Sequence, residues 1–149
     1  GEKIIFAGSK DDYLYAINED GSLRFAFLAD DSIYTSPSFL ELENDILIFF
    51  GSDNGTLYAI DIFGNLHEGF PKTSFSGSIV GSVMFSDINN SGRAEILFGD
   101  ETGNLNILTA TDESYSEFSN YNNFPNDYSY AYASSINIYD IKSDAFNIN

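Results

Sequence analysis

Apolar and polar positions along the chain repeat one short pattern. Residues 4–9 read IIFAGS, and similar runs return at residues 47–52 and 96–100. A further apolar run follows each copy after a few polar residues. The copies lie roughly 45 residues apart, a period typical of propeller blades built from short strands. Their matching glycines are Gly8, Gly51 and Gly99.

The same pattern predicts strands and almost no helix. The runs are rich in Ile, Phe, Tyr and Leu, and turn residues separate them. Asn54-Gly55 is a strong hairpin signal and predicts a type I′ turn, with positive φ at both residues. Runs that begin with small residues, at 33–39, 79–85 and 132–138, suit an innermost strand. We therefore expect four antiparallel strands in each repeat.

The predicted fold is all-β, a β-propeller fragment of about three to four four-stranded antiparallel blades, as part of a larger propeller. The blades fall at residues 1–31 (incomplete), 32–73, 77–127 (with a long outer loop) and 131–149 (the start of the next blade). The partners that complete the fold would be the remaining blades of the same chain. The Tyr- and Asn-rich part of the third blade is either a surface loop or a carbohydrate-contacting surface.

The net charge of the chain limits the classes of partner that it can bind. It has 23 acidic and 6 basic residues, a net charge of −17. Nucleic acid is excluded as a partner because binding would need clustered Lys and Arg. The charge favours solubility, a divalent cation or a cationic partner, and the alternative is a solvated acidic surface with no specific partner. Cysteine is absent, which removes thiolate metal sites. No apolar run is long enough for a membrane-spanning helix, so we expect no membrane insertion.

Residues 87–95 form an acidic loop that predicts a calcium site. Oxygen-bearing side chains alternate along it, and Gly92 stands where the loop must turn sharply. Calcium takes six to eight oxygen ligands, and neutral ligands make its binding weak, about 10⁻⁴ M. The alternative is a turn in which Asp87 and Asn89 bond the loop's own amides. The candidate ligands are Asp87, Asn89, Ser91, Glu95 and the carbonyl of Arg93.

Catalytic residues are scarce in this sequence. His67 is the single histidine, and it lies in a predicted outer strand, where we expect it to be exposed. No Gly-x-Ser-x-Gly sequence accompanies it, so a Ser-His-Asp triad is not indicated. The many carboxylates could include a glycosidase pair, but sequence spacing does not bring any two together. We therefore expect no catalytic residue and no enzyme.

Two motifs resemble known families. Residues 87–99, DINNSGRAEILFG, are similar to the FG-GAP/VCBS repeats of secreted bacterial and integrin-type β-propellers. Residues 55–61, GTLYAID, resemble the strand motif of PQQ-like propeller repeats. The first resemblance implies that Asp87, Asn89, Ser91 and Glu95 are calcium ligands, with Ser91 in place of the usual Asp. The chain contains no Trp, whereas the quinone-binding enzymes of the second group resemble one another partly through Trp-rich motifs, so the resemblance does not imply a quinone cofactor here.

The function expected is a non-catalytic binding, adhesion or display segment of a secreted or cell-surface bacterial protein. Its ligand would be a protein or a carbohydrate, bound by loops on a rigid frame. One alternative is part of a secreted polysaccharide-degrading or other hydrolytic enzyme, with catalytic residues elsewhere. Another is a periplasmic scaffold of the PQQ-like type.

Overall fold

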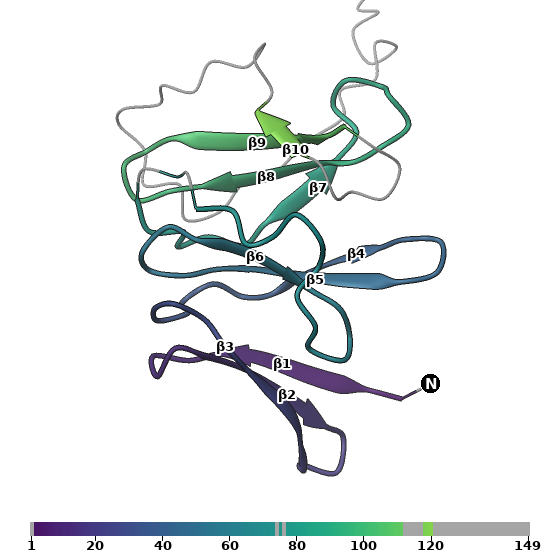
Figure 1. The fold of residues 1–149 in the computed structure, drawn as a ribbon, viewed down its shortest axis with the longest axis vertical. Helices are drawn as coiled ribbons and strands as arrows, with labels where there is room; N and C mark the ends of the chain where they lie inside the picture. Colours follow the sequence, from purple (N-terminus) through teal and green to yellow (C-terminus); the bar gives the residue numbers. More distant parts are fainter. Residues whose placement is uncertain (1, 74, 76, 112–117, 121–149) are drawn as a thin grey trace, which may run out of the picture.

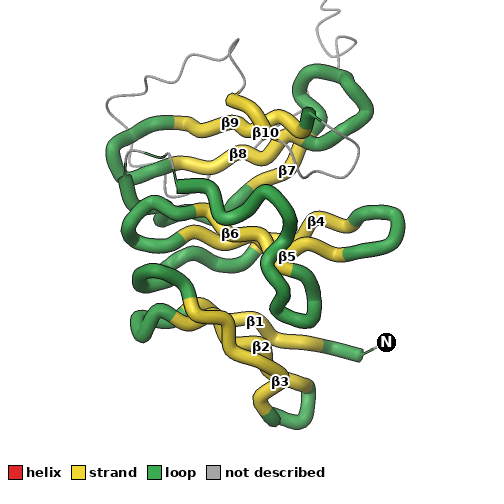
Figure 2. The backbone as a smooth tube through the Cα atoms, in the orientation of Figure 1, coloured by secondary structure: helices red, strands yellow, loops and turns green. Residues whose placement is uncertain are grey.

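Ten strands make up the part of the chain that the structure describes: residues 2–73, 75, 77–111 and 118–120 of a computed structural model (Figure 1). No helix occurs there (Figure 2), and so none that could cross a membrane. The all-β prediction is confirmed for these residues, whereas the predicted blade at 131–149 lies outside them. The strands are β1 (Ile4–Gly8), β2 (Tyr13–Asn18), β3 (Leu23–Leu28), β4 (Ser38–Glu41), β5 (Ile46–Gly51), β6 (Leu57–Ile60), β7 (Met84–Ser86), β8 (Glu95–Gly99), β9 (Leu105–Ala110) and β10 (Phe118–Asn120).

The strands form three antiparallel sheets, each made from strands that are consecutive in the chain. The first sheet has the order β1-β2-β3, the second β4-β5-β6, and the third β7-β8-β9-β10. The three sequence repeats take the same register in them. The glycine that ends each copy pairs with a leucine in the first two residues of the next strand: Gly8 with Leu14, Gly51 with Leu57, and Gly99 with Leu105.

The turns between these paired strands differ from the prediction. The type I′ turn is wrong, because Gly55 has a positive φ and Asn54 does not. The equivalent position holds Asp12 in the first sheet and Gly103 in the third, also with positive φ. One left-handed residue is therefore enough to reverse the chain here. Each turn is closed by the same backbone hydrogen bond: Ser9 N to Tyr13 O, Ser52 N to Thr56 O, and Asp100 N to Asn104 O, at 3.0, 2.9 and 3.1 Å.

Of the three described sheets, only the third has the four strands expected of a blade. In the second sheet, the chain after β6 returns along it through two isolated bridges, Ile60 with Leu66 and Leu57 with Lys72. Pro71 interrupts this segment and has no N–H group to donate, so a continuous fourth strand does not form.

The sheets stack face to face, with the second sheet between the other two (Figure 1). Successive side chains of β5 point to opposite faces. Ile48 and Phe50 pack toward the first sheet, and Leu47 and Phe49 pack toward the third. All four are fully buried. The core therefore lies in two layers, one on each face of the second sheet.

The same backbone contact joins each sheet to the next. The segment that enters the second sheet begins with Ile33, whose N–H donates to the carbonyl of Ser9 at 2.8 Å. The segment that enters the third begins with Ile79, whose N–H donates to Ser52 at 3.2 Å. A Cβ atom built on Gly51 would lie 2.4 Å from the Cβ and Cγ2 atoms of Ile79. Glycine is thus required for this close approach. The described sheets do not close into a ring, and the propeller stays a prediction.

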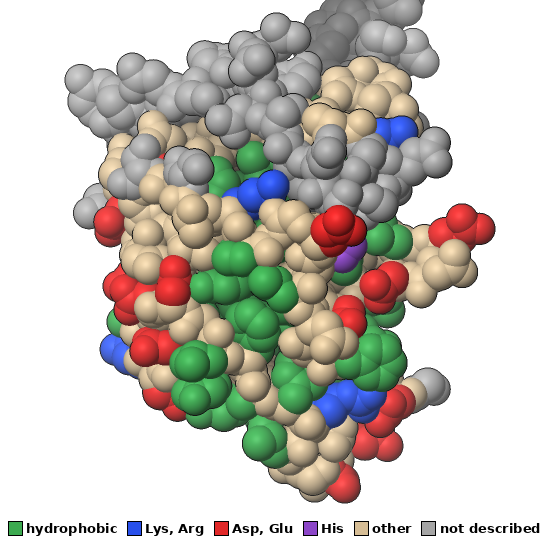
Figure 3. All heavy atoms as spheres, viewed as in Figure 1, with side chains coloured by type: hydrophobic (Ala, Val, Ile, Leu, Met, Phe, Trp, Pro, Cys, Tyr) green, Lys and Arg blue, Asp and Glu red, His purple; other side chains and the backbone are tan. Residues whose placement is uncertain are grey.

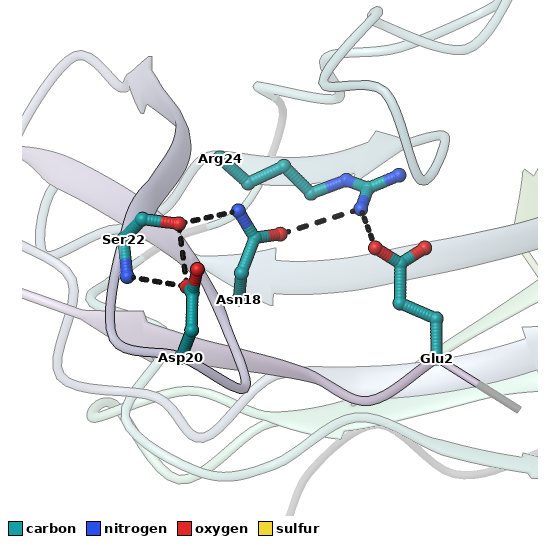
Figure 4. Close-up of polar contacts among 5 residues, drawn as sticks. All are labelled: Glu2, Asn18, Asp20, Ser22 and Arg24. Carbon is teal, nitrogen blue, oxygen red and sulfur yellow. Dashed lines mark hydrogen bonds and ion pairs between the residues drawn. The ribbon is translucent and has the colours of Figure 1, made fainter.

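Polar contacts stabilise the first sheet at the end that carries the β2–β3 turn, opposite the β1–β2 turn (Figure 4). Arg24 on β3 forms an ion pair with Glu2, just before β1, at 2.9 Å, and its guanidinium also donates to Asn18 on β2 at 3.4 Å. Asp20 closes the β2–β3 turn by accepting hydrogen bonds from the N–H and hydroxyl of Ser22. The ion pair is exposed on the Glu2 side, so it adds little stability.

The close contact at Gly51 gives a direct test of the sheet stacking. We expect Gly51→Ala to lower the free energy of unfolding by about 1–3 kcal/mol, the usual range for overpacking. Ile79→Gly removes both the Cβ and the Cγ2 atom that the new methyl group would meet. Urea unfolding should therefore show the double variant to be less destabilised than the sum of the two single variants. Additive effects would mean that Gly51 does not lie against Ile79.

Candidate functional site

The predicted calcium loop joins β7 to β8 and is wrapped around one carboxylate. Asp87 Oδ1 accepts the N–H of Ser91, and Asp87 Oδ2 accepts the N–H of Gly92, both at 2.8 Å. Asn89 Oδ1 accepts the Ser91 N–H as well, at 2.8 Å. Asn90 and Gly92 have positive φ, which allows the tight turn. The loop's own amides thus point at Asp87, as the turn alternative predicts.

Glu95 ties the other end of the loop. Its side chain is fully buried, and its Oε2 atom accepts the N–H of Ile88 at 2.8 Å. Its Oε1 atom accepts the side-chain amide of Asn89, also at 2.8 Å. Glu95 is therefore a structural anchor of the loop, whatever else it binds.

The candidate ligands Asp87, Asn89, Ser91 and Glu95 lie in one hydrogen-bonded loop. Arg93 continues it, and its N–H donates to Ser91 Oγ at 3.4 Å. An ionised carboxylate has about four acceptor positions, so Asp87 retains room for a cation beside its two amides. Within the described residues, no group of three or more His, Cys, Asp or Glu side chains could hold a metal ion. The donor set fits at most a weak calcium site, which stays a prediction.

A second carboxylate centre lies in the β8–β9 turn, where the sequence analysis singled out no residue. Asp100 is fully buried. Its Oδ1 atom accepts the N–H and hydroxyl of Thr102 and the N–H of Asn104, and its Oδ2 atom accepts the side-chain amides of Asn104 and Asn106. The signal was an Asp where the other two repeats have Ser, followed by three polar residues at alternate positions.

The environment of Asp100 favours its charged form. Burial raises the pKa of Asp100, but the hydrogen bonds from Thr102, Asn104 and Asn106 outweigh burial and hold the pKa below its ordinary value. These donors are supplied by the turn and by the start of β9. Asp100 therefore organises the turn and is already saturated with donors.

A third cluster joins the first two sheets. Asp30 Oδ2 accepts the side-chain amide of Asn54 at 2.8 Å and the hydroxyl of Thr56 at 2.5 Å. The N–H of Asp30 donates to the Tyr58 hydroxyl at 2.9 Å. Burial, together with the contact to Asp30, raises the pKa of Tyr58 to about 12. This cluster fixes the end of β3 on the β5–β6 turn, so we assign it a structural role.

An open groove lies between the β4–β5 hairpin and the turn after β6. Its volume is about 640 Å³. Three carboxylates line it, those of Glu41, Glu43 and Asp45, together with the exposed apolar side chains of Ile46 and Phe63. Figure 3 shows acidic side chains on this projecting hairpin. Acidic and apolar groups side by side can accommodate a ligand that is both basic and apolar.

His67 is not exposed as expected. Its side chain is half-buried, and its Nε2 atom is enclosed without a hydrogen-bond partner among the described residues. Its N–H donates to Ala59 O at 2.8 Å, which draws the residue onto the second sheet. The ring lies 6.3 Å from that of Phe70. His67 therefore packs as part of this edge of the second sheet.

No protein-family model matches the chain, and neither does any curated protein. The likeness to FG-GAP/VCBS and PQQ-like repeats therefore rests on the residues that carry it.

Asp100 gives a prediction about pH. We expect Asp100→Asn to lower the free energy of unfolding by about 1–3 kcal/mol at pH 7, because a new NH₂ group would face the donors of Asn104 and Asn106. The pKa of Asp100 is lowered on folding, so its carboxylate stabilises the fold above about pH 4, and this contribution is lost as the pH falls through the folded pKa. Urea titrations should show a smaller difference from the unsubstituted chain at pH 3. Glu43→Gln, at an exposed carboxylate, is the control and should show little difference at either pH. A constant difference for Asp100→Asn would contradict this account.

Proposed function

We propose that the chain is a non-catalytic binding segment of a β-propeller, in a secreted or cell-surface bacterial protein. The propeller is supported by three sheets that share one register and stack in one direction. It is also supported by the repeated hydrogen bonds from Ile33 to Ser9 and from Ile79 to Ser52. A frame of this kind holds its loops at fixed positions. The resemblance to FG-GAP/VCBS repeats supports the location outside the cytoplasm.

The observation that carries the binding function is the groove beside the β4–β5 hairpin. Phe63 is 67% exposed and Ile46, which lines the same groove, is 36% exposed; neighbouring exposed apolar side chains framed by polar ones are a feature of binding sites. The carboxylates of Glu41, Glu43 and Asp45 line the same groove, and like the net charge of −17 of the chain they favour a cationic ligand. We therefore propose a ligand that presents basic and apolar side chains together, such as an extended segment of a cationic protein.

The loop at Asp87 would have a supporting role in this scaffold. It projects on the same side of the stack as the β4–β5 hairpin, whereas the β1–β2, β5–β6 and β8–β9 turns lie on the opposite side (Figure 1). Calcium bound by Asp87, Asn89 and Ser91 would hold this loop in one conformation, while Glu95 anchors the loop through the hydrogen bonds its buried carboxylate accepts. Binding would be weak, since of these three ligands only Asp87 carries charge.

The groove is tested with a fluorescent peptide of alternating Lys and Leu. We expect it to bind the unsubstituted chain, and we expect the double variant Glu43→Gln, Asp45→Asn to weaken binding several-fold. The matched control is Asp11→Asn, Asp12→Asn, which removes two charges on the opposite side of the stack. Anisotropy titrations at 0.15 M salt compare the two, because that salt screens distant charges. Equal losses in the two double variants would mean that net charge alone attracts the peptide and that the groove is not a site.

The loop is tested by thermal unfolding with and without 5 mM calcium. We expect calcium to raise the melting temperature of the unsubstituted chain, because an ion that binds only the folded state stabilises that state. Asp87→Ala should abolish the rise. Asp20→Ala, which removes a turn carboxylate from the first sheet, should keep it. If calcium has no effect on the unsubstituted chain, the metal site is wrong, although the groove could still bind.

A further inference from the structure

Phe63 occupies a turn position that is acidic in the first repeat. By the repeat register, which pairs a glycine with a leucine in each hairpin, Phe63 is the counterpart of Asp20. The residues that follow them, Gly21 and Gly64, both have positive φ, so the two turns have similar backbones. Asp20 closes its turn by accepting hydrogen bonds from Ser22. A phenylalanine side chain accepts none, so another group must close the second turn.

Asp61 closes this second turn. Its Oδ1 atom accepts the N–H groups of Phe63 and Asn65, at 2.8 and 2.9 Å. Its Oδ2 atom accepts the side-chain amide of Asn65 at 2.8 Å. The Phe63 side chain takes no part in these hydrogen bonds, and most of its surface lies in water. The turn therefore does not need an aromatic side chain at this position.

The Phe63 ring differs from the other exposed aromatic rings of the described residues in having no partner. Tyr34 is also exposed, and the ammonium group of Lys10 lies 5.5 Å from the centroid of its ring. Phe39 is exposed too, and its ring packs against that of Phe6 with the centroids 5.6 Å apart. No described aromatic or cationic side chain contacts the Phe63 ring in this way. Its face can therefore accept a cation from a ligand.

The carboxylates of the same groove have no cationic partner within the described part of the chain. Glu41, Glu43 and Asp45, which we call the hairpin carboxylates, stand at alternate positions of the β4–β5 hairpin, and all three are exposed. No described Lys or Arg side chain forms an ion pair with them. Asp45 Oδ1 accepts the N–H of Ile46 at 2.8 Å, which leaves its second oxygen available. The groove thus combines an aromatic face with acceptors of matching charge.

Arginine is the basic side chain that can use both features at once. Its guanidinium is planar, so it can stack its face on an aromatic ring while the N–H groups at its edge donate to carboxylates. The ammonium group of lysine is compact and strongly hydrated, so it gains less from the ring. A divalent cation would bind the carboxylates and leave the ring in water.

We propose that the groove recognises an arginine side chain of its ligand, with the guanidinium stacked on Phe63 and donating hydrogen bonds to the hairpin carboxylates. Phe63 then determines the preference for arginine over lysine, whereas the carboxylates attract either residue. This inference rests on the proposed binding function of the groove and adds the identity of the basic residue that the groove selects.

Two fluorescent peptides of equal length test this preference, one alternating Arg with Leu and the other Lys with Leu. In anisotropy titrations, we expect the unsubstituted chain to bind the Arg peptide about two- to ten-fold more tightly, the range of an exposed cation–π contact. Phe63→Leu keeps an apolar side chain without the ring, so the ratio of the two dissociation constants should fall close to one. Phe63→Tyr restores a ring and should restore the ratio. The matched control Tyr34→Leu removes an exposed ring outside the groove and should keep it.

The other outcomes separate the arginine preference from the groove itself. Equal affinities of the unsubstituted chain for the two peptides would overturn the preference, and so would a ratio that Phe63→Leu leaves unchanged or that Tyr34→Leu also abolishes. In each of these cases, weaker binding of both peptides to the double variant Glu43→Gln, Asp45→Asn would still support the groove as a site. If neither peptide binds the unsubstituted chain, the groove and the preference are both wrong.

Discussion

The burial of the second sheet on both faces is the constraint on which the rest of the structure depends. A strand with one wet face alternates apolar and polar side chains, whereas a strand covered on both sides is apolar throughout. β5 reads Ile-Leu-Ile-Phe-Phe-Gly and is buried from Leu47 onward. Its two sets of side chains belong to different cores, one shared with the first sheet and one with the third. Neither core could form without this sheet, so no sheet here is an independent unit.

The close stacking of the sheets restricts the backbone as well as the side chains. The turn that follows β5 must let the next segment approach, and Gly51 permits it because a side chain there would overlap Ile79. Gly8 meets Ile33 in the same way. The recurring glycine, visible in the sequence as a repeat marker, is thus explained by contact between successive sheets. Its role is steric, since neither glycine has a positive φ.

Sequence reasoning located the strands of each hairpin because their signals are local, but it placed the innermost strands too early, at 33–39 and 79–85, where the structure has β4 at Ser38–Glu41 and β7 at Met84–Ser86. The register of β5 with β6 follows from two apolar runs separated by a short turn, as the hairpin signal at Asn54-Gly55 indicates. The turn type was wrong because a single left-handed glycine makes the reversal, held by hydrogen bonds between Ser52 and Thr56. The stacking of the sheets and the burial of His67 could not be predicted, since they depend on contacts between segments far apart in the chain.

In the candidate site too, the local features could be predicted from the sequence and the long-range ones could not. Sequence spacing put Asp87 and Glu95 at the two ends of one loop, where they do lie, because the alternation of oxygen-bearing side chains is a local property. It did not distinguish a ligand from an anchor. Asp87 is exposed, so an ion can reach it, whereas Glu95 is enclosed and accepts hydrogen bonds from the loop. Asp100 was missed for a related reason: its five donors come from the turn that it organises and from the start of β9, and a single Asp in place of Ser carries little information.

The hydrogen bond from each entering segment to the preceding turn has a consequence for how such a chain can change its length. Ile33 bonds to Ser9 and Ile79 bonds to Ser52, so each sheet takes its position from the one immediately before it. In stacks where each unit contacts only its neighbours, whole units can be gained or lost without redesign of the remainder. The natural unit of duplication or deletion is therefore the segment from one such isoleucine to the next, which leaves every junction of the same kind as before.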